Sequence, residues 1–230
     1  PQNPVLPQPP ILPQPGVVEK TVGGMNPDFT DLQSAIADLN TNGVPLGGVT
    51  YKIRTGTYTG PYTLTTQGTA LNPITFEADS GATPVLTGVP NSQTPTRPLF
   101  WINGSYVTIR GLTFSTTKMP SQIGVLGKAS NVTIEGNTFL YSPGTAIAYP
   151  YPSAIIIFGS GCLIENNSMT IDPPLSAGLA LGIWDDSGST IRGNQITVRE
   201  GSVIAINVTY YKVPHKTVID SNDIRCEKST

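Results

Sequence analysis

Charged residues are scarce in this chain: they make up 12% of its 230 residues and leave a formal net charge of −2. Without a basic surface, the chain has little to attract nucleic acid or an acidic membrane, so we expect neither partner. Histidine is scarcer still, and the single His215 has no Cys, Asp or second His at ligand spacing. The sequence therefore predicts no metal site and no cofactor.

Long apolar runs are also missing, since none reaches the roughly 18 residues that a membrane-spanning helix needs. No charged start followed by an apolar stretch marks an uncleaved signal peptide, which favours the interpretation that the chain is a mature form. What is abundant is Val, Ile and Thr in short runs, together with 24 Gly and 22 Pro. This composition predicts many short strands joined by tight turns.

One short repeat recurs five times between Tyr106 and Cys226. Each copy has an isoleucine, a turn, and a bulky apolar residue five positions after the isoleucine. The isoleucines are Ile109, Ile134, Ile164, Ile191 and Ile219. Their numbers differ by 25, 30, 27 and 28, a period typical of solenoids. Each copy is therefore expected to form part of one turn, or rung, of a solenoid.

An asparagine follows three residues after four of the five isoleucines. These residues are Asn137, Asn167, Asn194 and Asn222, and the first copy has Leu112 instead. Asparagine tolerates the left-handed backbone of a tight turn, and its amide both donates and accepts hydrogen bonds. Since stacked strands lie about 4.8 Å apart, we expect an internal ladder of these four asparagines.

Strand, Asn-bearing turn and strand, recurring once per period, resemble the right-handed parallel β-helix of the pectate lyase-like superfamily. The segment DFTDLQSAIADL followed by YKIRTGTYTG resembles the amino-terminal cap and first coil of such proteins, closest in style to secreted bacterial surface β-helix proteins. The resemblance implies an all-β, right-handed parallel β-helix with an N-terminal capping α-helix, in a secreted protein that is extracellular or at the cell surface. Fold alone does not determine activity.

We expect one β-helix domain over residues 17–230, preceded by a Pro-rich extended arm at residues 1–16. Within the domain, a cap helix is predicted at about 31–39, with Thr30 and Gln33 spaced as a capping box and Asn42-Gly43 as its stop. The segment after the helix is expected to form less regular rungs, and regular rungs follow at about 98–226. A second apolar strand is expected before each repeat, in segments 99–102, 123–126, 154–158, 179–184 and 203–208.

The two cysteines, Cys162 and Cys226, fall at different points of the repeat and two rungs apart. Two rungs correspond to about 9.6 Å of stacking, which is beyond the reach of a disulfide. We expect both to be reduced, with Cys162 buried.

Enzymes of the resembled superfamily act on acidic polysaccharides. A lyase needs carboxylates to hold calcium and an Arg or Lys to take a proton, and a hydrolase needs two carboxylates across the bond. Asp185, Asp186 and Arg192 are the catalytic candidates. The Asp pair closes its strand without the companion motifs of polygalacturonases, so a solvated turn and an exposed arginine are the alternatives, and the sequence leans against an enzyme.

Planar aromatic residues in the variable loops suit the faces of sugar rings, and plain loop packing is the alternative. These sugar-binding candidates are Tyr149, Tyr151, Trp184, Tyr210 and Tyr211. In the proline-rich arm, apolar pairs suggest docking on another surface, with a flexible spacer as the alternative. These assembly candidates are Val5, Leu6, Ile11 and Leu12.

Two functions follow. The first is an extracellular structural or adhesive β-helix that assembles head-to-tail through its open C-terminal rung and its arm, with copies of itself or a surface polysaccharide as partners. The second is a polysaccharide lyase or glycoside hydrolase acting on acidic polysaccharide, with calcium as a cofactor only if it is a lyase.

Overall fold

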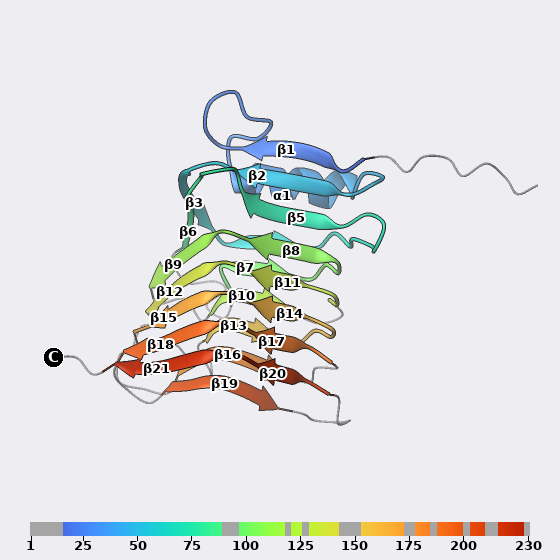
Figure 1. Ribbon diagram of the computed structural model, residues 1–230. Helices are drawn as coiled ribbons and strands as arrows, with labels where there is room; N and C mark the ends of the chain where they lie inside the picture. Colours follow the sequence, from blue (N-terminus) through green and yellow to red (C-terminus); the bar gives the residue numbers. More distant parts are fainter. Residues whose placement is uncertain are drawn as a thin grey trace, which may run out of the picture.

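The chain forms three parallel β-sheets stacked along one axis, as Figure 1 shows. The computed structural model describes residues 16–88, 97–117, 121–125, 129–142, 153–172, 178–184, 188–199, 203–209 and 216–227. We call the three sheets A, B and C, in the order in which each turn of the chain passes through them. Each full turn adds one strand to each sheet. This is the all-β parallel β-helix, of the right-handed type, that the repeat predicted.

Sheet A consists of β1 (Val18–Val22), β2 (Val49–Ile53), β5 (Ile74–Ala78), β8 (Val107–Arg110), β11 (Thr133–Glu135), β14 (Leu163–Glu165), β17 (Thr190–Arg192) and β20 (Val218–Asp220). Sheet B consists of β3 (Gly56–Gly60), β6 (Pro84–Gly88), β9 (Thr113–Thr117), β12 (Thr138–Ser142), β15 (Ser168–Ile171), β18 (Gln195–Arg199) and β21 (Asp223–Glu227). Sheet C consists of β4 (Tyr62–Leu64), β7 (Phe100–Ile102), β10 (Ser121–Val125), β13 (Ser153–Ile157), β16 (Gly178–Trp184) and β19 (Val203–Thr209).

In-register stacking builds the core, because equal positions of the repeat lie directly above one another. In sheet A the repeat isoleucines form one column, from Ile109 to Ile219. In sheet B the apolar residues five positions on form another, which includes the stacked rings of Phe114 and Phe139 at 4.9 Å. Residues of both columns are buried as far as Ile191 and Ile196. The strands of sheet C are those expected before each repeat.

The turn between sheets A and B differs from the prediction in one respect. The left-handed residue is the one before the ladder asparagine, and the asparagine itself has a negative φ. The residues with positive φ are Gly111, Gly136, Asn166, Gly193 and Ser221. Glycine holds three of these five places because it lacks the Cβ that makes this conformation costly. The asparagine that follows it keeps an ordinary backbone conformation, and its side-chain amide points into the interior between the rungs.

The asparagine ladder is present between Asn137 and Asn222. The Nδ2 of Asn137 donates to Oδ1 of Asn167 at 3.1 Å and to the Ile109 carbonyl at 2.9 Å. The same Oδ1 accepts from the backbone N of Asn137 at 3.0 Å. The pattern repeats from Asn167 to Asn194 and from Asn194 to Asn222. Each amide therefore satisfies buried backbone groups of neighbouring rungs that water cannot reach.

The predicted helix is α1 (Leu32–Asn42), which lies beside β1 and β2 at the N-terminal end of the stack in Figure 1. The expected capping box at Thr30 is wrong by one residue. Asp31 is the N-cap, with extended backbone, and its side chain accepts from the Ser34 N–H at 2.7 Å. Gly43, at φ 75°, ends the helix as expected, although the helix runs beyond the predicted end.

Neither cysteine forms a disulfide, as expected; Cys162 is buried, also as expected, and Cys226 is exposed. In the part of the chain that the structure describes, no helix has the length and apolar character needed to cross a bilayer.

The ladder generates a test of stability. Asn167→Ala removes the acceptor of two buried N–H groups of Asn137, and the donor to the Ile134 carbonyl, so we expect a loss of about 3 kcal/mol in the free energy of unfolding. Ser168→Ala, at the next and exposed position, serves as the control and should change it by less than about 0.5 kcal/mol. Urea unfolding measures both. Equal stabilities of the two variants would refute a structural role for the ladder.

Candidate functional site

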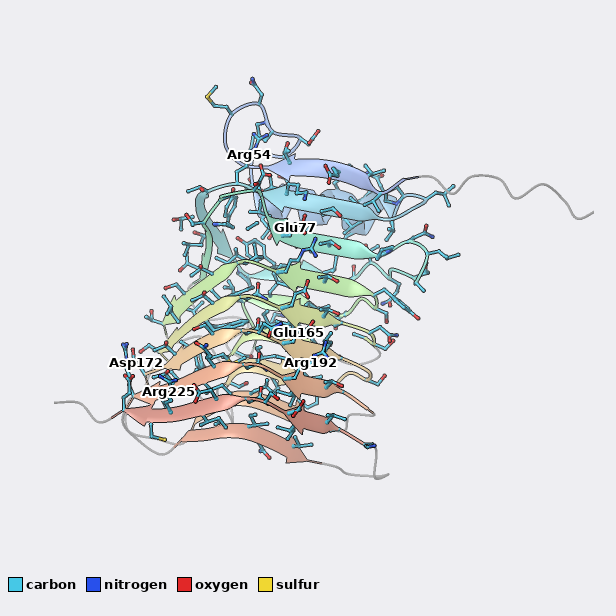
Figure 2. All side chains as sticks on the ribbon, viewed as in Figure 1. Arg54, Glu77, Glu165, Asp172, Arg192 and Arg225 are labelled. Atoms are coloured by element: carbon cyan, nitrogen blue, oxygen red, sulfur yellow. The ribbon has the colours of Figure 1, made fainter. Side chains whose placement is uncertain are left out.

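A row of charged side chains runs along the outer face of sheet A, one from each of seven consecutive strands. The residues pair in register across the sheet. They are Lys52, Glu77, Arg110, Glu135, Glu165, Arg192 and Asp220. Figure 2 labels three of them, Glu77, Glu165 and Arg192, on the strands of this sheet. We call this set the charged row.

The pleat of the strands explains why these side chains point outward. In each rung the charged residue directly follows the core residue of its strand, as Arg110 follows Ile109 and Glu135 follows Ile134. Successive side chains of a strand point to opposite faces, so a buried isoleucine places the next residue outside. The strand pairing then aligns these outer residues along the axis of the β-helix.

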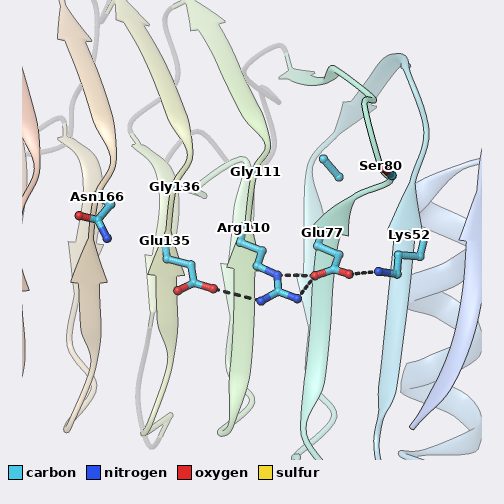
Figure 3. Close-up of a pocket in the computed structure, with 9 residues that line it drawn as sticks. Lys52, Glu77, Ser80, Arg110, Gly111, Glu135, Gly136 and Asn166 are labelled. Carbon is cyan, nitrogen blue, oxygen red and sulfur yellow. Dashed lines mark hydrogen bonds and ion pairs between the residues drawn. The ribbon is translucent and has the colours of Figure 1, made fainter.

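Glu77 is the most buried member of the charged row, with 5% of its surface exposed. Lys52 and Arg110, on the strands to either side, both hydrogen-bond and ion-pair with its carboxylate, as Figure 3 shows. Burial alone works to raise the pKa of Glu77, but the hydrogen bonds and charges of Lys52 and Arg110 outweigh it and hold the pKa below its usual value. Glu77 is therefore ionised at neutral pH.

The two cations beside Glu77 are held in their charged forms. The hydrogen bond to Glu77 is the main cause that raises the pKa of Lys52. Burial works to lower the pKa of Arg110, but its bonds to Glu77 and Glu135 outweigh that effect and raise it. Both groups therefore act as hydrogen-bond donors and not as proton acceptors at neutral pH.

The continuous line of ion pairs stops between Glu135 and Glu165, which lie opposite each other on β11 and β14. Glu135 lies near Arg110, with Nη1 to Oε1 at 3.4 Å, while Glu165 accepts from Nε of Arg192 at 2.7 Å. Two like charges on adjacent strands, about 4.8 Å apart, repel each other. Each carboxylate is thus paired on one side only, and the pair forms a break in the row that is rich in hydrogen-bond acceptors.

A shallow groove of about 450 Å³ runs along the charged row from Lys52 to Glu135, at the bend from sheet A into sheet B. Charged walls come from Lys52, Glu77, Arg110 and Glu135, and Asn166 lies at its end, as Figure 3 shows. The lining also includes Ala78, Ser80 and the two turn glycines Gly111 and Gly136. Since these residues are small, they leave the backbone of the bend open to a ligand.

Of the catalytic candidates chosen from the sequence, Arg192 belongs to the charged row, where it is ion-paired with Glu165. Asp185 and Asp186 lie outside the described residues, directly after the end of β16. Trp184 ends β16, but its side chain lies outside the described part, as do Tyr149, Tyr151, Tyr210 and Tyr211. The assembly candidates Val5, Leu6, Ile11 and Leu12 lie there too.

The sequence analysis missed most of the charged row, although the repeat contains its signal. The residue after the isoleucine is charged in all five copies, as Arg110, Glu135, Glu165, Arg192 and Asp220. Lys52 follows Tyr51 and Glu77 follows Phe76 in the two preceding rungs, where an aromatic residue replaces the isoleucine. Comparing this position between copies would have identified the row. Among the described residues, no three His, Cys, Asp or Glu side chains meet in an arrangement that could hold a metal ion.

The chain matches no family model and no curated protein. Two solved structures are similar to it over 91% of its length at 14% identity. One is titled rhamnogalacturonan lyase, of which 62% is covered, with a TM-score of 0.42. The other is an alginate lyase from Paenibacillus sp. str. FPU-7, of which 99% is covered, with a TM-score of 0.39. This chain thus spans less than two thirds of the first enzyme, and its function has to come from its own residues.

The position of Glu77 predicts a specific pH dependence. A carboxyl group whose pKa is lower in the folded state stabilises the fold above its unfolded pKa of about 4.3, and this contribution is lost as the pH falls through the folded value. Glu77→Gln should lower the free energy of unfolding at pH 7 by about 1–3 kcal/mol and flatten its decline below about pH 4.3. Chemical unfolding at a series of pH values measures both effects.

The matched control is Glu135→Gln, which removes a carboxylate of the same row that is more exposed than that of Glu77. Its pair with Arg110 at 3.4 Å is expected to contribute less than about 1 kcal/mol. Hydrogen bonds from Thr21 lower the pKa of Asp28. Both variants keep Asp28, so their free energy of unfolding should still fall somewhat at low pH. If the free energy of unfolding depends on pH in the same way in both variants, the stabilising role of the Glu77 carboxylate is wrong.

Proposed function

We propose that this chain is an extracellular structural or adhesive β-helix protein that binds polysaccharide along the charged row of sheet A. The observation that carries the proposal is the break in the row, where Glu135 and Glu165 face each other with one cation each. Carboxylates that lack a second donor favour a ligand that brings donors of its own. Sugar hydroxyl groups supply such donors without adding a charge.

The flanking cations complement this acceptor-rich break. Arg110 and Arg192 lie on either side of the two glutamates, and about half of each side chain is exposed. A guanidinium group offers several N–H donors in a fixed plane, which suits hydroxyl pairs and carboxylates of a sugar. Because the row repeats at the strand spacing of about 4.8 Å, a polymer lying along the axis would meet a new charged residue at each rung.

The state of the cations favours binding over cleavage. A lyase needs a base that takes a proton near the cleaved bond, and its pKa should lie near the working pH. The carboxylates beside Lys52 and Arg110 raise their pKa values and so oppose that role. The same pairing keeps both side chains in place as donors, which lowers the entropy cost of holding a ligand.

The N-terminal end of the molecule fits the structural part of the proposal. Helix α1 buries Leu32, Ile36 and Leu39 beside the first rungs, and Asn40 bonds to the backbone of Thr63 and Thr65. We assign this helix the role of an N-terminal cap, which shields the first rung from edge-to-edge association. The arm at residues 1–16 is assigned a role in attachment.

A polysaccharide lyase or glycoside hydrolase is the second candidate, and one observation favours it. Glu135 lines the open groove, and Glu165 lies opposite it on the adjacent strand. Hydrolases use such a carboxylate pair across the bond that they cleave. Incubation with polygalacturonate, alginate and rhamnogalacturonan, with and without calcium, would reveal unsaturated products or new reducing ends. If the chain shows such activity and Glu135→Gln or Glu165→Gln abolishes it, the main function is catalysis and not binding.

Removing one guanidinium from the row tests the binding proposal. We expect Arg110→Gln to weaken polysaccharide binding about tenfold, which corresponds to about 1.4 kcal/mol. Titration calorimetry with alginate, rhamnogalacturonan, polygalacturonate and a neutral glucan measures the affinity and identifies the preferred polymer. The thermal unfolding of the variant shows whether its fold is intact.

Arg225→Gln is the matched control, because it makes the same change on β21 of sheet B, away from the charged row. It should bind as the unaltered chain does. The proposal is wrong if none of the polymers binds, or if Arg110→Gln and Arg225→Gln weaken binding equally.

A further inference from the structure

A column of threonines lies beside the charged row on the outer face of sheet A. On each strand the threonine stands two residues before the charged residue, so both side chains point out of the same face. The strand pairing stacks these positions in register from β2 to β17. The threonines are Thr50, Thr75, Thr108, Thr133 and Thr190, with Leu163 in the rung between the last two. We call this set the threonine column.

The hydroxyl groups of the threonine column are open to a ligand. Each of the threonines is half-buried and stands between two buried neighbours of its own strand. Within the described part of the chain, none of these hydroxyls has a hydrogen-bond partner. Since the strands lie about 4.8 Å apart, the column presents a hydroxyl and a methyl group at each of these rungs. Such a surface suits a sugar ring, which carries hydroxyl groups at its rim and C–H groups on its faces.

The charged row beside this column offers little to an acidic ligand. It holds three cations, Lys52, Arg110 and Arg192, and four carboxylates, so its formal charge is −1. Each of the cations is already ion-paired with a glutamate of the row. A negatively charged polymer would have to compete with those glutamates, and Glu135 and Glu165 would repel it at the break. A neutral polymer meets neither cost.

We propose that the polysaccharide bound along the charged row is a neutral one, with its rings over the threonine column. This inference rests on the proposed function, because it names the class of polymer for the same face of sheet A. The hydroxyl groups of the polymer donate to Glu135 and Glu165 and accept from the exposed parts of Arg110 and Arg192. Polymers of uronic acids, such as polygalacturonate and alginate, are then the weaker ligands.

The dimensions of the two sets allow one polymer chain to touch both. The threonine column and the charged row are two residues apart on each strand, which corresponds to about 6.6 Å. Leu163 replaces threonine on β14, opposite Thr133 and two residues before Glu165. The break in the row therefore has an apolar neighbour on one strand and a hydroxyl group on the other. This combination favours a ring that packs through its C–H face while its hydroxyl groups reach the carboxylates.

Titration calorimetry with neutral and acidic polymers tests the inference. The probes are soluble β-glucan and galactomannan on one side and polygalacturonate and alginate on the other. We expect the preferred neutral polymer to bind at least about ten times more tightly than either acidic one. The double variant Glu135→Gln with Glu165→Gln removes the repulsion at the break, so it should raise the affinity for polygalacturonate several-fold without raising that for the neutral polymer.

The threonine column is tested by a second double variant, Thr108→Val with Thr133→Val. Valine keeps the shape and the strand preference of threonine but lacks the hydroxyl group, so the fold should persist. We expect the neutral polymer to bind about tenfold more weakly. The matched control is Thr170→Val with Thr197→Val, which makes the same change at paired, half-buried positions on sheet B and should bind as the unaltered chain does.

The outcomes separate this inference from the proposed function. Acidic polymers that bind as tightly as the neutral ones would overturn the inference and leave polysaccharide binding in place. Equal affinities of the two threonine double variants for the neutral polymer would overturn it too, because the column would then make no contact. If none of the polymers binds, the proposed function fails and the inference fails with it.

Discussion

In-register parallel stacking is the constraint on which the rest of this molecule depends. Because each rung places the same repeat position above the last, several columns form the apolar core, one forms the asparagine ladder and one forms the charged row. The tight turn between sheets A and B explains the ladder, since buried backbone groups such as the Asn137 N–H and the Ile109 carbonyl find their partners in the side-chain amides of the ladder. The register that satisfies these buried groups also aligns the charges outside.

Some of this architecture could be predicted from the sequence because the repeat isoleucines and asparagines have a clear period. The sequence could not show which turn residue takes the left-handed conformation, since Asn166 and the ladder residue Asn167 are adjacent and chemically identical. Most of the charged row could not be predicted from single residues either. A single Glu77 on a strand looks like a solvated residue, and only the register between rungs puts it between Lys52 and Arg110. The aromatic and Asp185 candidates came from loop composition, which carries no register.

The charged row lies along the axis of the β-helix, from Lys52 on β2 to Asp220 on β20. A polymer that lies along it would meet several charged residues in succession. Each later contact forms at a high effective concentration, so weak individual contacts add up to firm attachment. The proposed binding function needs such attachment, whereas an enzyme must release its product.

The central claim is that polysaccharide lies over the break between Glu135 and Glu165. Carbodiimide labelling of carboxylates, located by mass spectrometry with and without the bound polymer, tests it most directly. The account predicts that the polymer lowers the labelling of Glu135 and Glu165 and leaves that of Asp172 and Glu227, at the edge of sheet B, unchanged. Unaltered labelling of the two glutamates in the presence of bound polymer would contradict it.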